Sequence, residues 1–226
     1  MAQSGSYWWL FYLVRAVLRI GFRLFFRAEY HGAHHVPASG GCIIAGNHVS
    51  YLDPPLIGCA ARRPLRFVGR DTLFRFRFSS WFFRSIRLVP LDRTRGDVAA
   101  LRAGIRVVRD GDGLALFPEG TRSPDGQLQP AKGGIGFLVS KSQVPVVPVY
   151  VQGTFEAYPK AARLPRPRKV RVFFGPPIMP EAFAAFGKGR EAYERMAGLI
   201  MERIAALRDE AEEKLEVGSR KSEVGT

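Results

Sequence analysis

Short apolar runs alternate with helix-like stretches from residue 41 onward, and this pattern indicates an α/β fold. Six runs that are apolar, or that alternate between apolar and polar positions, are predicted as strands at 42–45, 66–69, 88–91, 114–117, 144–151 and 169–174. Apolar residues that recur every three or four positions predict helices at 51–61, 98–108 and 190–215. Strands separated by helices favour a mostly parallel sheet flanked by helices, and the prolines in 144–151 indicate an edge strand or a slanted pairing.

Residues 7–27 follow a different pattern, in which aromatic and aliphatic residues are interrupted by four arginines spaced four positions apart. They are Arg15, Arg19, Arg23 and Arg27. On a helix the four guanidinium groups form one polar stripe, opposite Trp9, Leu13, Val17 and Phe25. A membrane-spanning helix needs roughly 20 mostly apolar residues, and four arginines within that length oppose insertion. We therefore expect an amphipathic helix in a membrane interface, with its arginines among lipid phosphates. The alternative is a helix that docks on the protein's own core.

The chain of 226 residues is long enough for one core. The expected organisation is a membrane-associating helix and connector at 1–35, an α/β domain at 36–217 and a flexible tail at 218–226. The net charge is +14, and the first 110 residues hold 17 Lys and Arg against 6 Asp and Glu. Such a field suits an anionic partner, either a membrane surface or nucleic acid. Aromatic residues and arginines at 75–84 fit both partners, and the N-terminal helix favours the cytoplasmic face of a membrane, with no nucleic acid.

The two cysteines are expected to be packing residues, and the clustered histidines are not expected to bind a metal. Cys42 and Cys59 lie in apolar or small-residue surroundings, which is typical of buried packing residues in a reducing compartment. His31, His34 and His35 share a connecting loop, but no carboxylate or cysteine has the spacing of a metal ligand, so we expect no metal site.

The segment NHVSYLD at 47–53 directly follows the strand predicted at 42–45. In open α/β sheets, ligands bind beyond the carboxyl ends of the strands, where this turn is expected to lie. On one helix His48 and Asp53 would be about 140° apart. With Ser50 as N-cap and Asp53 at N3, however, His48 precedes the helix, and its imidazole can fold back to the carboxylate. Such a pair forms a general base with a fixed tautomer, and a purely structural hydrogen bond is the alternative.

The segment FPEGTRS at 117–123 follows another buried strand and opens at the same edge of the sheet. Glu119 can accept hydrogen bonds from substrate hydroxyls, Gly120 permits close backbone approach, and Arg122 offers a two-pronged donor to phosphate. Arg93 brings another cation to the end of a strand. The G-x-S-x-G pattern of serine hydrolases is absent from the sequence, so the base is expected to take its proton from the substrate.

Four segments, NHVSYLD, VPLDR, FPEGTRS and VPVVPVYVQGT, resemble in this order the sequence blocks of the glycerolipid acyltransferases, specifically the 1-acyl-glycerol-3-phosphate acyltransferases. The resemblance covers most of residues 41–155 and implies that His48 is the general base and Asp53 its partner. It also implies that the acceptor is bound by Asn47, Arg70, Arg93, Glu119, Gly120, Thr121 and Arg122. Arg87 departs from the family pattern, which often has glycine there. Arg70 replaces a common lysine, which preserves charge but not geometry.

The expected reaction is transfer of a fatty acyl group from acyl-CoA or acyl carrier protein to the free hydroxyl of 1-acyl-glycerol 3-phosphate, giving phosphatidic acid. The thioester is a co-substrate, and no bound cofactor is expected. Two alternatives stay open. One is the same chemistry on another lysolipid, such as lyso-ornithine lipid, or on glycerol 3-phosphate. The other is a non-catalytic basic protein that binds membranes or nucleic acid.

Overall fold

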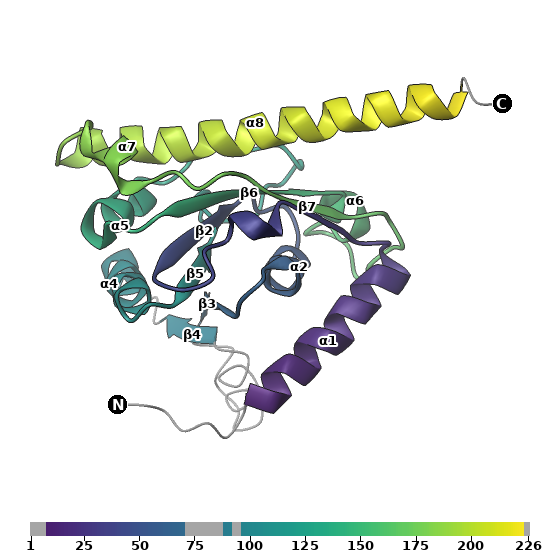
Figure 1. Ribbon diagram of the computed structural model, residues 1–226, viewed down its shortest axis with the longest axis horizontal. Coiled ribbons are helices and arrows are strands. Elements are labelled where there is room, and N and C mark those ends of the chain that lie inside the picture. Colours follow the sequence, from purple (N-terminus) through teal and green to yellow (C-terminus); the bar gives the residue numbers. More distant parts are fainter. Residues whose placement is uncertain (1–7, 71–87, 92–95, 224–226) are drawn as a thin grey trace.

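A computed structural model describes residues 8–70, 88–91 and 96–223, and its centre is one seven-stranded sheet (Figure 1). The strand order is β1-β7-β6-β2-β5-β3-β4. Every neighbouring pair is parallel except β6 and β7, so the prediction of a mostly parallel α/β sheet is confirmed. The strands are β1 (Glu29–His31), β2 (Cys42–Gly46), β3 (Leu65–Arg70), β4 (Leu88–Leu91), β5 (Gly113–Leu116), β6 (Val146–Gln152) and β7 (Arg171–Phe174).

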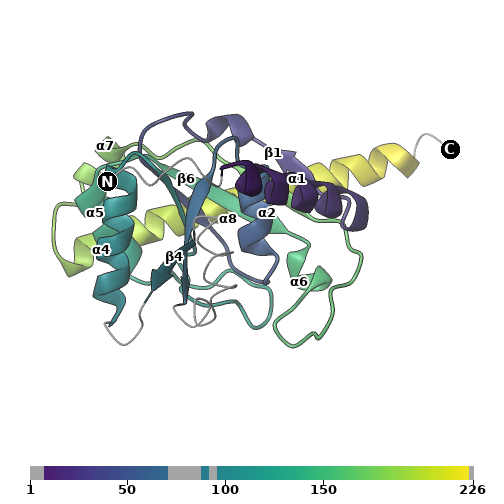
Figure 2. The same cartoon turned by 90° about the horizontal axis from the view of Figure 1, so that it is seen from below.

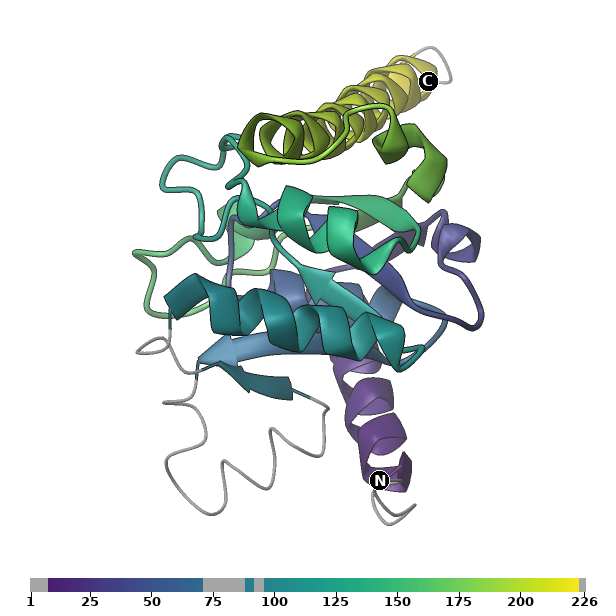
Figure 3. The same cartoon turned by 90° about the vertical axis from the view of Figure 1, so that its left-hand side faces the viewer.

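Helices cover both faces of the sheet, and the described ones carry the labels of Figure 1. They are α1 (Trp8–Phe25), the 3₁₀ turn η1 (Ala33–His35), α2 (Asp53–Ala60), α4 (Gly96–Arg109), α5 (Gly134–Ser142), α6 (Thr154–Ala157), α7 (Pro180–Ala184) and α8 (Arg190–Glu223). The helices α4 and α5 lie side by side, with α8 beyond α5 (Figure 3). The helices α1 and α2 pack together on the other face (Figure 2).

The alternation of side chains along β2 explains why the sheet has two apolar cores. Ile43 and Ala45 point into the core formed with α4, α5 and α8, whereas Cys42 and Ile44 point into the core formed with α1 and α2. Each of these four residues is at most 1% exposed. A strand buried on both faces is typical of a parallel sheet. Cys42 and Cys59 are both buried and unbonded to each other, which confirms their prediction as packing residues.

The helix α1 presents one face to the protein and another to solvent. Phe11, Phe22 and Phe26 on this helix and at its end are buried. The opposite side exposes a continuous row of apolar side chains, which we call the outer face of α1: Trp9, Leu13, Val17, Ile20 and Leu24. No helix among the described residues is both long and apolar enough to cross a bilayer.

The arginine stripe of α1 lies closer to the protein than expected. The Arg15 guanidinium donates a hydrogen bond to the carbonyl oxygen of Ala61, at the carboxyl end of α2. The Arg19 guanidinium lies 5.2 Å from the centre of the Tyr30 ring. The expectation that the arginines lie among lipid phosphates is therefore wrong for Arg15, because its side chain stabilises the end of α2, where the helix dipole favours a cation.

The structure differs from the predicted elements in several places. The strand β6 lies inside the sheet between β7 and β2, so the edge-strand alternative is wrong. The antiparallel ladder with β7 begins at Val149, and the missing N–H of Pro148 therefore does not interrupt it. The short elements β1, η1, α5, α6 and α7 were not predicted. The helix α8 continues to Glu223, into the segment expected as a tail, and the patch at 75–84 lies outside the described residues.

Candidate active site

Three neighbouring strands carry the candidate site at their carboxyl ends. The strands β5, β2 and β6 are adjacent and parallel; a sequence block follows β5 and another follows β2, and a third contains β6 and ends two residues beyond it. The turn 47–52 follows β2, the turn 117–123 follows β5, and Gly153 with Thr154 follows β6. Because parallel strands end at the same edge, the fold gathers side chains that are more than 100 residues apart in sequence, such as Asp53 and Thr154.

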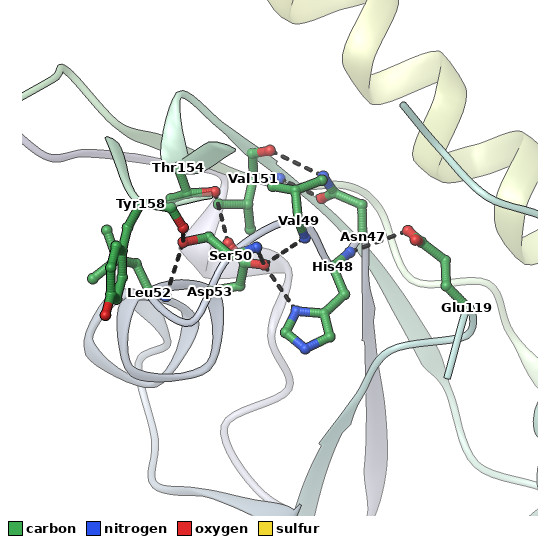
Figure 4. Close-up of polar contacts among 10 residues, drawn as sticks. All are labelled: Asn47, His48, Val49, Ser50, Leu52, Asp53, Glu119, Val151, Thr154 and Tyr158. Carbon is green, nitrogen blue, oxygen red and sulfur yellow. Dashed lines mark hydrogen bonds and ion pairs between the residues drawn. The ribbon is translucent and has the colours of Figure 1, made fainter. Parts of the chain in front are cut away.

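The His48 imidazole and the Asp53 carboxylate meet as predicted, although the N-cap of α2 is Leu52 and not Ser50, and Asp53 is the first residue of the helix (Figure 4). Nδ1 of His48 lies 2.9 Å from Oδ2 of Asp53, and Asp53 is fully buried. The same oxygen accepts the main-chain N–H groups of Val49 and Ser50, each at 2.7 Å. The helix α2 begins at Asp53, two residues later than predicted, with Pro54 in its first turn. The carboxylate therefore closes the turn and holds the imidazole at the same time.

The environment of His48 leaves one ring nitrogen available. The imidazole stacks on the Phe117 ring, with centroids 4.0 Å apart and an interplanar angle of 16°. Its main-chain N–H donates to Oε1 of Glu119, and its carbonyl oxygen accepts the N–H of Ser123 at 2.7 Å. The side chain is 18% exposed. With Nδ1 facing the carboxylate, Nε2 points away from Asp53 (Figure 4), which is the orientation that a general base requires.

Glu119 lies beside this pair and is 2% exposed. One carboxylate oxygen accepts the His48 N–H at 3.1 Å, whereas the other is buried without a hydrogen-bond partner among the described residues. Burial, and to a smaller extent the negative charge of Asp53, raise the pKa of Glu119 to about 7, against the hydrogen bond from His48. The site thus holds an acid that is partly protonated near neutral pH.

The rest of the FPEGTRS turn forms the wall next to Glu119. Gly120 has φ +69°, and a Cβ there would lie 2.9 Å from Cδ of Lys132. Thr121 is exposed. The guanidinium carbon of Arg122 lies 3.4 Å from the centre of the Tyr51 ring, and its Nη1 is buried without a hydrogen-bond partner in the described part of the chain. A stacked guanidinium with an unpaired N–H group is suited to bind an anion.

The other predicted acceptor residues have different placements. The Asn47 side chain forms two hydrogen bonds with the main chain of Val151 on β6: its Nδ2 donates to the carbonyl oxygen at 3.1 Å, and its Oδ1 accepts the N–H at 2.7 Å. Asn47 is 2% exposed. Arg70 ends β3, which is adjacent to β5 and parallel to it, so its backbone lies at the edge that carries the site. Arg93 lies outside the described residues.

The histidine loop does not form a cluster of ligands. Nδ1 of His35 is 2.8 Å from the carbonyl oxygen of Phe174, and the His31 ring stacks on Phe173. Within the residues that the structure describes, no three His, Cys, Asp or Glu side chains gather in the arrangement that a metal ion needs.

Three residues at the site were not singled out from the sequence. Thr154 donates a hydrogen bond to Asp53, Tyr51 stacks on Arg122, and Lys132 packs over Gly120. Tyr51 and Thr154 lie within segments that resemble family blocks, so their position was a usable signal. Nothing in the local sequence around Lys132 indicates its contact with a glycine 12 positions earlier.

The class of protein with this fold and these turns is the acyltransferases. The acyltransferase family model matches residues 27–152. This match spans more than half of the chain, and the chain belongs to the acyltransferase family. The crystal structure of the 1-acyl-sn-glycerophosphate acyltransferase PlsC from Thermotoga maritima is similar, with a TM-score of 0.67 and 26% identity. That similarity covers 87% of this chain and 82% of the Thermotoga chain.

Particular relatives carry the name 1-acyl-sn-glycerol-3-phosphate acyltransferase. The chloroplastic BAT2 protein of Brassica napus is 32% identical over 138 residues, which cover 60% of this chain and 40% of that protein. The Bacillus subtilis protein is 23% identical over 187 residues, which cover 82% of this chain and 90% of that protein. The chain thus spans less than half the length of the plant relatives BAT2 and LPAT1 but most of the bacterial relative.

Proposed function

We propose that this protein transfers a fatty acyl group from acyl-CoA or acyl carrier protein to the free hydroxyl of 1-acyl-glycerol 3-phosphate, producing phosphatidic acid. The observation that carries the proposal is the His48–Asp53 pair, in which Nε2 faces away from the carboxylate and the FPEGTRS turn lies alongside. The family membership supports the reaction class, and the names of the relatives support this acceptor.

His48 acts as the general base in this reaction. Nε2 removes the proton from the acceptor hydroxyl as the hydroxyl oxygen attacks the thioester carbonyl, and Asp53 stabilises the imidazolium that forms. When the tetrahedral intermediate collapses, the carbon–sulfur bond breaks and the imidazolium returns the proton to the leaving thiolate. General-base assistance contributes about 10²–10⁴ in rate, so the alignment of two lipid substrates supplies much of the remainder.

The acceptor's phosphate binds on the side of the FPEGTRS turn. The unpaired Nη1 of Arg122 offers a charge-assisted hydrogen bond to this phosphate. Arg70 ends β3 at the edge that carries the site, and the acceptor contact stays a prediction for it and for Arg93, while Glu119 and Thr121 face the glycerol. Asn47 supports the turn through Val151 in place of the acceptor contact predicted for it.

The outer face of α1 docks on the membrane that supplies the acceptor. Its five side chains are each 52–78% exposed, and a row of this length on one helix suits the boundary between headgroups and acyl chains. Arg23 and Arg27 are also exposed and can reach lipid phosphates. The excess of arginine in the first half of the chain favours the cytoplasmic leaflet, where acyl thioesters are available.

The reaction is tested with the purified full chain, an isotope-labelled acyl thioester and a panel of acceptors, with products identified by mass spectrometry. We expect labelled phosphatidic acid from 1-acyl-glycerol 3-phosphate. A product only from lyso-ornithine lipid or glycerol 3-phosphate would move the assignment to that acceptor, and no product from any acceptor would favour a non-catalytic binding protein.

The role of the base is tested with His48→Ala, which we expect to abolish transfer while circular dichroism stays unchanged. The matched control is His34→Ala, because His34 is an exposed histidine in the loop after β1. Near-normal transfer by His48→Ala would disprove the assignment of the base.

Membrane docking is tested by flotation with vesicles that contain anionic lipid. Val17 is 60% exposed on the outer face of α1, and Val17→Asp should leave most of the protein unbound. Met179 is 48% exposed next to α7, and Met179→Asp is the control that should float like the wild type. Equal binding of both variants would mean that α1 does not form the membrane contact.

A further inference from the structure

The two oxygens of the Asp53 carboxylate have separate partners. Oδ2 accepts three hydrogen bonds from the turn 48–50, including the one from the His48 ring. Oδ1 accepts a hydrogen bond of 2.6 Å from the Thr154 hydroxyl, and both residues are fully buried. Within the described structure, Thr154 is thus the hydrogen-bond donor to Oδ1 of Asp53. Thr154 follows β6, whereas His48 follows β2.

The backbone holds Thr154 firmly in this position. Gly153, which precedes it, has φ +81°, and a Cβ there would lie 2.2 Å from the carbonyl oxygen of Lys169, so glycine is required. Thr154 opens the short helix α6, and its carbonyl oxygen accepts the N–H of Tyr158 at 2.8 Å. The Ser50 hydroxyl in turn donates to the carbonyl oxygen of Tyr158 at 2.7 Å. The two ends of α6 are therefore bonded to this turn, the first through Asp53 and the second, at Tyr158, through Ser50.

We propose that Thr154 is a positioning residue for the acyl transfer, a role that rests on the proposed function of His48 as the base. Its hydroxyl fixes the rotation of the Asp53 carboxylate, so that Oδ2 stays in line with the imidazole. The carboxylate then holds the proton on Nδ1, and the lone pair of Nε2 stays directed at the acceptor hydroxyl. Without the hydroxyl, Oδ1 is a buried carboxylate oxygen with no hydrogen-bond donor, and the carboxylate rotates towards another donor.

The kinetic test compares Thr154→Val, which keeps the shape of the side chain, with Thr154→Ser, which keeps the hydroxyl. We expect Thr154→Val to lower kcat roughly 10- to 100-fold, with the KM for the acceptor within about twofold of the wild type. Thr154→Ser should retain kcat within about threefold. In an Asp53→Asn background, Thr154→Val should cause no further loss, because the two residues act as one unit.

Several results would overturn the proposal. Wild-type kcat in Thr154→Val would mean that the hydroxyl does not matter, and an equal loss in the serine variant would mean that packing alone is responsible. A change in KM alone would make Thr154 a substrate contact. If Thr154→Val and Thr154→Ala both fail to fold while Thr154→Ser folds, the hydroxyl serves the fold and the positioning role is wrong.

A second measurement does not depend on activity. Nitrogen-15 NMR of the imidazole reports which ring nitrogen of His48 carries the proton, with His48→Ala used to assign the signal. The wild type should show the Nδ1–H tautomer, and Thr154→Val should show a mixture. If the wild type transfers no acyl group to any acceptor, the proposed function fails, whereas an unchanged tautomer in Thr154→Val would show that the positioning role is wrong.

Discussion

Glu119→Gln offers a quantitative test of the electrostatics of the site. In the folded protein the pKa of Glu119 is raised from 4.5 to about 7, chiefly by burial. Because the folded state holds this proton more tightly than the unfolded chain, the wild type loses stability as the pH rises from about 4.5 through 7. Glutamine has nearly the same shape, keeps an oxygen for the His48 N–H and cannot ionise. The free energy of unfolding of the variant therefore lacks this decrease with rising pH.

The magnitude follows from the two pKa values. One pKa unit corresponds to about 1.4 kcal/mol, so raising the pKa from 4.5 to about 7 lowers the free energy of unfolding by about 3 kcal/mol at alkaline pH. Part of this loss is already present at pH 5. Between pH 5 and pH 8.5 we expect Glu119→Gln to gain about 2–3 kcal/mol relative to the wild type. For a domain of this size, that gain corresponds to about 5–10 °C in Tm.

The assay is thermal unfolding followed by tryptophan fluorescence at a series of pH values between 5 and 8.5. Glu202→Gln removes an exposed glutamate on α8 and is the matched control for the loss of one charge. A constant difference between Glu119→Gln and the wild type reflects the amide itself, and only the part that changes with pH reports on ionisation. A difference that stays constant across the series, or that shrinks as the pH rises, would refute the reasoning.

Two further predictions concern packing and anion binding. Gly136→Ala should destabilise the protein by several kcal/mol in urea unfolding, because its Cβ would lie 1.9 Å from the carbonyl oxygen of Tyr193 on α8. Gly198→Ala is the control: this glycine is exposed on α8 with nothing within 4 Å, so helix propensity should add about 1 kcal/mol, and a loss there would contradict the packing argument. Tyr51→Leu should raise the KM for the phosphate-bearing acceptor about 3- to 30-fold with little change in kcat, because the Arg122 guanidinium loses its stacking partner. Tyr51→Phe should behave like the wild type, and an equal KM for all three proteins would show that the stacking has no role in binding.

The local sequence was sufficient to predict the elements that follow one clear periodicity, and also the meeting of His48 with Asp53. That contact spans five positions, and both of its residues lie in NHVSYLD, although the cap predicted at Ser50 lies at Leu52 instead. The helix α5 was missed because it has only nine residues and begins at a glycine pair, which argues against a helix. The strand β6 was predicted at an edge because its prolines lack an N–H group. Its ladder with β7 begins only after Pro148, and this register depends on a strand more than 20 residues further along the chain than Pro148.

The roles of polar residues at the site were harder to predict for the same reason. Asn47 was expected to contact the acceptor, but its amide bonds Val151, which lies 104 positions along the chain. The position of Thr154 in a block that resembles the family indicated a place at the site but not its contact with Asp53, since that contact exists only when β6 lies next to β2. Residue type and order indicated the chemistry, whereas the partner of each polar atom depended on tertiary structure.

The long sequence separation of these contacts has a consequence for biosynthesis. Asn47, Ser50 and Asp53 bond residues that lie 104, 108 and 101 positions later. A ribosome therefore releases the histidine turn well before the segment that locks it, and the apolar outer face of α1 emerges earlier still. With the membrane docking proposed for α1, a nascent chain can reach a bilayer while its site is still unassembled. Activity begins only after β6 and α6 have been translated and have joined the sheet.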